Sequence, residues 1–469
     1  MIKRYFEYVV LPNRHHAVPL PSGRKTGLMM RWHYGYSRAE RCPTGMMMDL
    51  ALFLNHDAYM LADATLPAAD GGLLRRNLVI AGGRIAAISE QPPGAGLPVA
   101  HLGGAMVWPA MADIHTHLDK GFIWDRTPNP DGTFMGALQA VNQDREAYWS
   151  VEDVRRRMTF ALRCAHAHGT QAVRTHLDTM GAHGHTVWPL IREMQAQWAG
   201  RIALQAVSLA MPQSYAGEEG ERIAREVAAT PGACLGAVLM HDNATPEHLE
   251  RLFALAEKFG CGLDLHVDEN NVRGGTALQA VAEMVMRRRF SLPVLCGHCC
   301  SLSVQDAPRQ KEIVQSVADA GMGIVSLPMC NLYLQDRQPG RTPLWRGVSM
   351  VHELHAAGVP VMFASDNTRD PFYAYGDLDM AEVFSQAVRI AHLDHPFGGW
   401  WQSVSVTPAR WMGLDTTLRA GNPADLVIFE ARDMNQLVTR PAAPRTVIRH
   451  GRVLDARVPA YTELEQPAP

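Results

Sequence analysis

The sequence predicts an α/β protein: a (β/α)8 TIM barrel joined to a small β-sandwich domain that is built from both ends of the chain. Two observations predict this fold. Short apolar runs alternate with helical stretches eight times through the middle of the chain, and β-rich segments with turn signals flank this region on both sides. The chain has 469 residues, of which 47% are hydrophobic, enough to bury a large core.

Both flanks have the pattern of short strands around tight turns. Residues 77–88 consist of two strand-like segments around a Gly-Gly turn. Residues 424–429 and 446–454 have the same character near the other end. In addition, Ile80-Ala-Gly-Gly-Arg-Ile85 resembles Ile448-Arg-His-Gly-Arg-Val453. Two separated pieces of one small β domain explain these similarities.

Eight short apolar runs set the rhythm of the middle of the chain. They end near Met111, His176, Ala210, Met240, His266, His298, Leu327 and Ser365. After a first gap of 65 residues, the gaps are 34, 30, 26, 32, 29 and 38 residues. Helical periodicity fills the intervals, as in 246–259, 274–289 and 310–320. This pitch is typical of a (β/α)8 barrel. A doubly wound open sheet is the alternative, but the sequence has neither G-x-G-x-x-G nor a P-loop.

We therefore expect four parts in chain order. They are an irregular N-terminal extension (1–47), the first part of the β-sandwich (48–108), the barrel (109–415), and the second part of the β-sandwich with a tail (416–469). The first 45 residues carry eight Lys or Arg residues against two Glu, a local net charge of +6. No apolar segment of signal-peptide length follows these basic residues.

Charge and cysteine usage narrow the classes of partner. With 44 Lys and Arg against 47 Asp and Glu, the net charge is −3, which argues against nucleic acid or an anionic membrane as a partner. No apolar run reaches the roughly 18 residues of a transmembrane helix.

The eight cysteines are sparse and lie mostly in apolar stretches, which is typical of free thiols in a cytoplasmic protein. The C-x-x-C-C segment at Cys296 lacks the second ligand pair of a structural zinc site.

Polar side chains gather where the predicted barrel strands end, which is where barrel enzymes carry their catalytic groups. His115 and His117 are two residues apart in an extended segment, so both imidazoles can face one ion. The ends of later runs add His266, Asp268, Glu269, His298, Asp366 and Asn367. Alone, each has an ordinary explanation, such as a chance pair, a core histidine or a helix N-cap. Their joint placement on one face predicts a metal site instead.

These motifs resemble the amidohydrolase superfamily, and within it the cytosine deaminase branch, which includes N-isopropylammelide amidohydrolase. The resemblance covers about Met48 to Asp455. The matching segments are His115-Thr-His-Leu-Asp-Lys120, Met211-Pro-Gln213, Leu265-His-Val-Asp-Glu269, Gly297-His298 and Ser365-Asp-Asn-Thr-Arg-Asp-Pro-Phe-Tyr373.

The resemblance implies a complete set of site residues. The metal ligands would be His115, His117, His266 and Asp366, and the metal one divalent ion, Zn or Fe(II). Glu269, His298 and Asp366 would handle protons. Gln213 would bind the substrate ring and Phe372 would wall the pocket. Asn367 stands where cytosine deaminase has Asp, and Phe372 where it has Trp. Because an amide donates as well as accepts hydrogen bonds, the pocket is expected to prefer a differently decorated ring.

One feature favours a single metal ion. Two-metal members of the superfamily use a carboxylated lysine at the end of the fourth strand. The five lysines of this chain are Lys3, Lys25, Lys120, Lys258 and Lys311. None lies near Met240, where the fourth run ends, and His241 there is expected to be structural.

The implied activity is hydrolytic deamination of a cyclic amidine, cytosine or a close analogue, with release of ammonia. Water activated at the metal would attack the ring carbon that bears the amino group. Asp366 or His298 would take the proton of the water, and Glu269 would protonate the ring nitrogen. The alternative is release of an alkylamine from an N-substituted aminotriazine such as isopropylammelide. A non-catalytic scaffold is the least favoured hypothesis, because the chain retains every ligand. Relatives of this kind are often homo-oligomers, so a homo-oligomer is also compatible with the resemblance.

Overall fold

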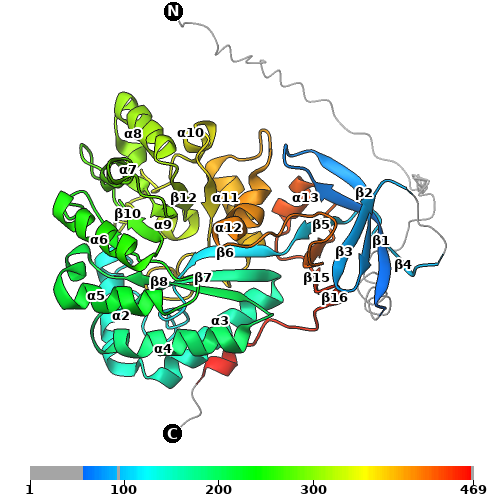
Figure 1. Ribbon diagram of the computed structural model, residues 1–469, viewed down its shortest axis with the longest axis horizontal. Coiled ribbons are helices and arrows are strands. Elements are labelled where there is room, and N and C mark those ends of the chain that lie inside the picture. The colour runs from blue at the N-terminus through cyan, green and yellow to red at the C-terminus, as the bar shows by residue number, and fades with distance from the viewer. Residues whose placement is uncertain (1–55, 92–95, 466–469) are drawn as a thin grey trace, which may run out of the picture. The chain divides into compact units, whose positions relative to one another are not determined.

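The computed structural model describes residues 56–91 and 96–465. All of them belong to one compact unit that spans Thr44–Pro469 (Figure 1). The N-terminal extension expected at 1–47 lies outside the described residues. Within the described part of the chain, no helix is long and apolar enough to cross a membrane.

Eight parallel strands form the centre of the fold. They are β6 (Met111–Thr116), β7 (Thr170–Asp178), β8 (Ala203–Leu209), β9 (Val238–Leu239), β10 (Leu263–Val267), β11 (Val294–His298), β12 (Gly323–Ser326) and β13 (Val361–Phe363). They pair in the orders β6-β7-β8 and β13-β12-β11-β10-β9. Single parallel bridges join the two sheets, Val207 to Cys234 on one side and Thr116 to Asp366 on the other. The fold is therefore TIM-barrel-like, with two linked sheets in place of one continuous sheet.

The predicted strand positions agree closely with this arrangement except at the first run. The first apolar run was expected to end near Met111, but β6 begins there and continues to Thr116. The preceding apolar residues belong to β5 (Met106–Pro109), which pairs with a different sheet. Two buried strands that follow each other without a polar break look like one run in the sequence.

Helices follow the strands, as the alternation predicted. They are α2 (Phe134–Tyr148), α3 (Val151–Ala167), α4 (Gly181–Trp198), α5 (Gly217–Ala228), α6 (Pro246–Phe259), α7 (Ala277–Arg288), α8 (Ala307–Asp319), α9 (Pro328–Leu334), α10 (Val351–Ala356), α11 (Met380–Ala391), α12 (Val406–Trp411) and α13 (Met434–Thr439). Short 3-10 turns lie at Pro212–Tyr215, Cys300–Val304, Trp400–Val404 and Tyr461–Leu464. The bounds of α6 match the prediction because its ends are marked locally. Thr245 caps its N-terminus, and Gly260 supplies the left-handed C-terminal residue at φ 69°.

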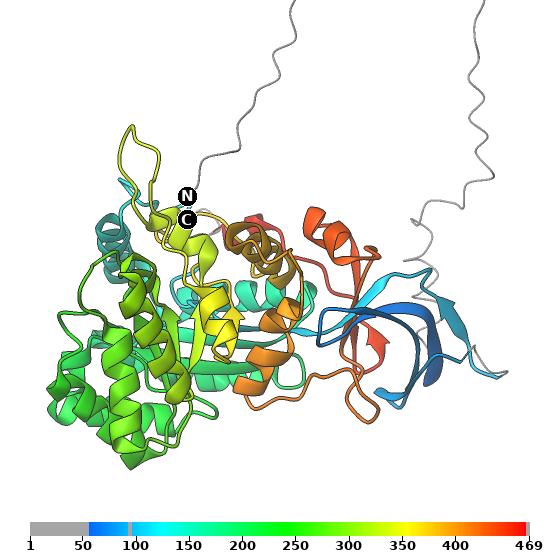
Figure 2. The ribbon, with the colours of Figure 1, turned by 90° about the horizontal axis from the view of Figure 1, so that it is seen from above.

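The two flanks of the chain share one sheet. Its strands are β1 (Ala58–Pro67), β2 (Leu73–Ala81), β3 (Arg84–Ser89), β4 (Val99–His101), β5, β14 (Leu426–Phe429), β15 (Arg445–Arg449) and β16 (Arg452–Val453). The order is β16-β15-β14-β5-β1-β2-β3, with β4 beside β1. Figure 2 shows the blue N-terminal strands together with the red and orange C-terminal ones. The shared domain was expected as a sandwich, whereas the described residues form a single mixed sheet.

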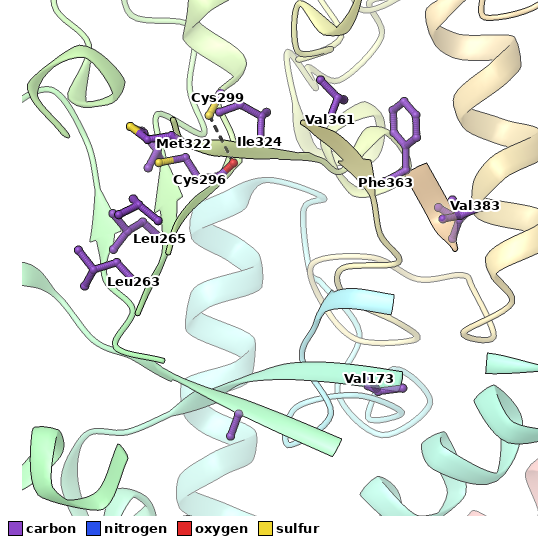
Figure 3. Close-up of a cluster of buried hydrophobic side chains, with 14 of the residues drawn as sticks. Val173, Leu263, Leu265, Cys296, Cys299, Met322, Ile324, Val361, Phe363 and Val383 are labelled. Carbon is purple, nitrogen blue, oxygen red and sulfur yellow. Dashed lines mark hydrogen bonds between the residues drawn. The ribbon is translucent and has the colours of Figure 1, made fainter. Parts of the chain in front are cut away.

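Alternate residues of the central strands face two separate hydrophobic clusters. Leu265, Cys296, Ile324 and Phe363 pack in the cluster that includes the helices, and Figure 3 shows Phe363 near Val383 of α11. Their neighbours Leu295, Val325 and Met362 belong to the other cluster. The seven cysteines at described positions are free and buried, and Cys42 lies outside the described residues. This two-sided packing fixes where each strand ends, and so where the polar side chains beyond it begin.

Candidate active site

Three imidazoles and a carboxylate meet at the ends of the central strands. His115 lies within β6 and His117 directly follows it, His266 comes from β10, and Asp366 follows β13. The Nε2 atom of His266 lies 3.2 Å from Nε2 of both His115 and His117. Oδ1 of Asp366 lies 3.2 Å from Nε2 of His117 and 3.6 Å from Nε2 of His115. The structure therefore brings together all four residues that the resemblance names as ligands.

These four side chains fit a divalent cation. Tetrahedral ligands at roughly 2.0–2.1 Å from zinc stand about 3.3 Å apart, close to the observed separations. Neither carboxylate oxygen of Asp366 has a hydrogen-bond partner among the described residues, although both are buried. Burial lowers the pKa of His115 and His266 well below the usual value. Imidazoles in this state are neutral, which is the form that ligates a metal.

The backbone joins the first and last strands at the cluster. The amide of Asp366 donates to the carbonyl of His115 at 2.9 Å. Asp113 is fully buried and accepts from the backbone N–H of Ser365 at 3.1 Å and from its hydroxyl at 2.5 Å. Asp366 has φ 63°, a left-handed conformation that disfavours a branched residue. Asp113 and Ser365 thus position the ligand without facing the cavity.

His176, which was not among the predicted site residues, is part of the same cluster. It lies near the end of β7, and its ring centroid is 3.9 Å from that of His115. His115, His176 and His266 also place nitrogen atoms close enough to hold an ion. Nε2 of His176 is 3.6 Å from Asp264, which in turn accepts from Arg174 at 2.9 Å. Its place at the end of the second predicted run was the signal that could have found it.

Glu269 and His298 lie beside the cluster and share a partner. Nδ2 of Asn331, on α9, is 3.1 Å from Oε1 of Glu269 and 3.0 Å from Nδ1 of His298. Burial, followed by the nearby Asp366 carboxylate, raises the pKa of Glu269 well above its usual value. A carboxyl group in such a place can carry a proton at neutral pH. Asn331 was not among the predicted site residues, because it stands in an apolar stretch that carries no recognisable motif.

A cavity of about 220 Å³ opens beside these residues. Its walls include the apolar side chains of Leu138, Val141 and Phe372. Phe372 packs against Phe134 with the ring centroids 5.4 Å apart. A polar group on another side is formed by Lys120, Arg145 and Asp178, in which Asp178 accepts from Lys120 at 2.9 Å and from Arg145 at 2.6 Å. The cavity therefore offers flat apolar walls and a few fixed polar groups, as small-ligand sites do.

The predicted substrate-binding residues have different positions. Asn367 and Phe372 line the cavity together with Glu269 and His298. Gln213 lies in the 3-10 turn after β8, is exposed, and is not among the cavity-lining residues described. Met211, two residues earlier, lines the cavity in its place.

Comparisons of the sequence and the structure with known proteins agree on one family. The chain matches the sequence profile of the Amidohydrolase family over residues 152–455. It is 46% identical over 430 residues to a pterin deaminase of Rhizobium rhizogenes (strain K84), covering 88% of this chain and 97% of that protein. It is 23% identical to N-isopropylammelide isopropyl amidohydrolase of Pseudomonas sp. (strain ADP), covering 80% and 92%. Among solved structures, 5-methylcytosine deaminase from Klebsiella pneumoniae with 5-fluorocytosine has a TM-score of 0.75 at 25% identity, covering 85% and 97%.

The fold and the site define a hydrolase that acts on C–N bonds in cyclic compounds. The chain belongs to the amidohydrolase family.

Proposed function

We propose that this protein is a metal-dependent hydrolytic deaminase of an amino-substituted nitrogen heterocycle, and that it releases ammonia. The observation that carries this proposal is the convergence of three imidazoles and Asp366 beside Glu269 at the wall of one cavity. The relative with 46% identity is named a pterin deaminase. A pterin carries an amino group on a cyclic amidine, the class of ring expected from the sequence, so we place pterins ahead of cytosine as the substrate class.

The proposed cofactor is one divalent ion, Zn or Fe(II), held by His115, His117, His266 and Asp366. When bound, such an ion lowers the pKa of water from 15.7 to roughly 7 and so supplies hydroxide at neutral pH. Three imidazoles and a carboxylate suit either metal.

The residues of the chain supply the remaining steps. The apolar walls, Phe372 among them, hold the ring flat and exclude water. Asp366 accepts a hydrogen bond from the attacking water and orients it toward the ring carbon. Glu269 gives a proton to the neighbouring ring nitrogen, so that negative charge does not build up on the ring. As the oxygen on the carbon becomes a carbonyl, its remaining proton goes to Glu269, while the amino group takes the proton held by Asp366 and leaves as ammonia.

His298 has a narrower proposed role than the sequence suggested. The Nδ2 group of Asn331 has hydrogens and no free lone pair, so Nδ1 of His298 acts as the acceptor of this contact. The hydrogen of the neutral ring is then on Nε2, which has no hydrogen-bond partner among the described side chains. We therefore propose that His298 donates a hydrogen bond at the reacting atoms and that Asp366 takes the proton of the water.

The alternative activity is release of an alkylamine. A distant relative is named N-isopropylammelide isopropyl amidohydrolase, and Leu138 and Val141 supply an apolar wall that could receive an alkyl group. Both activities use the same attack on a ring carbon and differ only in the leaving amine.

A substrate screen with metal-loaded protein tests the proposal. Ammonia release would be measured with pterin, cytosine, 5-methylcytosine, isocytosine and ammelide, and alkylamine release with N-isopropylammelide. We expect ammonia from pterin at the highest kcat/KM, and Glu269→Gln as the inactive control. Alkylamine as the dominant product would favour the alternative, and no amine from any ring would refute both.

A further inference from the structure

The loop that follows Asp366 contains two hydrogen-bonded side chains, Asn367 and Asp370, and the backbone of the loop fixes the orientation of Asp370. Asp370 is fully buried. Its Oδ1 accepts from the backbone N–H groups of Phe372 at 2.8 Å and Tyr373 at 3.1 Å. Its Oδ2 accepts from Nδ2 of Asn367 at 2.7 Å. Both oxygens of this carboxylate are therefore occupied as acceptors.

This pairing decides which end of the Asn367 amide remains for a ligand. An amide has a donating nitrogen and an accepting oxygen, and the two look alike in shape. With its nitrogen toward Asp370, the Asn367 amide donates a hydrogen bond to the carboxylate. With its oxygen there, the two oxygens would repel each other. Oδ1 of Asn367 accepts only a weak hydrogen bond, from Sγ of Cys330 at 3.8 Å among the described residues, which leaves most of the accepting capacity of this oxygen free. Asn367 lines the cavity, and Oδ1 is the end of its amide that Asp370 leaves available.

We propose that Asp370 is a positioning residue for substrate selection: it holds Asn367 with Oδ1 toward the ligand, so that the cavity selects a heterocycle carrying an N–H at this point. This inference rests on the proposed function for the nature of the ligand. It assigns Asp370, which touches no ligand itself, a role in specificity. It also explains how Asn can stand where cytosine deaminase has Asp, because both residues then present an acceptor oxygen.

An exchange of the two side chains is the sharpest test. In Asp370→Asn the oxygen of the new amide keeps the two backbone N–H groups, so its nitrogen faces Asn367 and favours the reversed orientation of the Asn367 amide, with Nδ2 toward the cavity. In Asn367→Asp two carboxylates face each other across the same contact. In the double variant N367D/D370N, the new amide donates to the new carboxylate, and an acceptor again faces the cavity. We expect each single variant to lose selectivity and the double variant to regain it.

The readout is the preference for an N–H ring over its N-methylated analogues, measured as a ratio of dissociation constants and, separately, as a ratio of kcat/KM. Wild type should prefer one N–H ring by at least about tenfold, because an unpaired polar group is costly in such a site. Asp370→Asn should reduce that preference at least about tenfold, and the double variant should restore most of it. Metal content and thermal unfolding would be measured for each variant to establish that it is folded.

The matched control is Asp125→Asn. Asp125 braces the same loop through Arg369 at 2.8 Å, but its carboxylate is largely exposed and does not contact the amide. It should leave the preference unchanged. An Asp370→Asn variant that keeps the wild-type preference, or a wild type without one, would overturn the inference. Absence of ammonia from every ring would refute the proposed function, while the ratio of dissociation constants would still decide the role of Asp370.

Discussion

Nδ2 of Asn331 lies 3.1 Å from Oε1 of Glu269, and the same nitrogen lies 3.0 Å from Nδ1 of His298. Asn331 is fully buried on α9, and Gln335, directly after this helix, donates to the backbone carbonyl of Glu269 at 3.3 Å. Oε1 of Glu269 is thereby committed as an acceptor, which leaves Oε2 to carry a proton toward the ring. Asn331 thus holds both Glu269, the proposed proton donor, and His298, the proposed hydrogen-bond donor.

Replacing Asn331 by Leu should reduce kcat by roughly 10- to 100-fold, less than most of the roughly 10²- to 10⁴-fold that a positioned proton donor contributes, because Glu269 itself remains. KM should change little, because Asn331 does not line the cavity. The Leu side chain has a similar size but leaves Glu269 and His298 without their shared donor. Steady-state kinetics would measure the split between kcat and KM. Leu332→Ala, on the same helix, is the control, and an equal loss in both variants would indicate a merely structural effect.

Glu269→Gln should keep its metal and lose turnover by about 10²- to 10⁴-fold. The amide preserves the shape of the side chain but cannot exchange a proton with the ring nitrogen. Metal content by atomic absorption and ammonia release would be measured on the same sample. A variant with near-normal kcat would remove Glu269 from the proposed mechanism.

His266→Ala and Asp366→Ala should both lose metal. Each removes one of four mutually adjacent ligand atoms, and the remaining three would bind far more weakly. Equilibrium dialysis of each variant against Zn or Fe(II) would measure the stoichiometry. His241→Ala provides a histidine control, since His241 lies in the turn after β9 and is not in the cluster. Full metal occupancy in His266→Ala would contradict the proposed ligand set.

The sequence could predict the strand ends because a buried strand leaves a plain pattern: an apolar run that stops where polar groups begin. His115 and His117 were visible because two residues on an extended strand face one side, and His298 closes β11 as expected. Gln213 stays a prediction: its motif is present, but its side chain is exposed in the 3-10 turn after β8.

Other parts of the site depend on contacts that no local pattern records. Asn331 reaches Glu269 from a position 62 residues later in the chain. His298 and Asp366 adopt left-handed backbone conformations, with φ 66° and 63°, which tertiary packing imposes on residues that ordinarily avoid them. Asp370 determines which end of the Asn367 amide faces the cavity. The sequence contains both residues but does not reveal the hydrogen bond between them.

Stability should depend on acid pH through Asp178. Although burial raises its pKa, Lys120 and Arg145 outweigh this and lower the pKa to about 2. The unfolded value is about 3.9, so the ionised carboxylate stabilises the fold fully above about pH 4 and loses this effect as pH falls toward 2. The contribution is about 2 kcal/mol at neutral pH. Urea unfolding of metal-free wild type and Asp178→Asn would show a difference at pH 7 that narrows below pH 4. A difference independent of pH would contradict the pairing.

A methyl group at Gly297 should disturb the proposed metal site without changing the chemical identity of any ligand. A Cβ at this position would lie 2.9 Å from Cε1 and 3.1 Å from Nδ1 of His115. The imidazole would have to move by several tenths of an ångström, and its Nε2 would leave the common centre. We expect Gly297→Ala to weaken metal affinity by roughly 10- to 100-fold, the range seen when the support of a ligand is changed.

Gly260→Ala is the control for a generic loss of stability, since a Cβ there meets no atom within 4 Å although the residue is left-handed at φ 69°. It should lower the melting temperature and leave metal affinity unchanged. Gly297→Ala should have the opposite pattern. It should change the melting temperature of the metal-free protein little and the dissociation constant of the metal strongly. Equal metal affinity in Gly297→Ala and wild type would show that His115 does not need its present position to ligate.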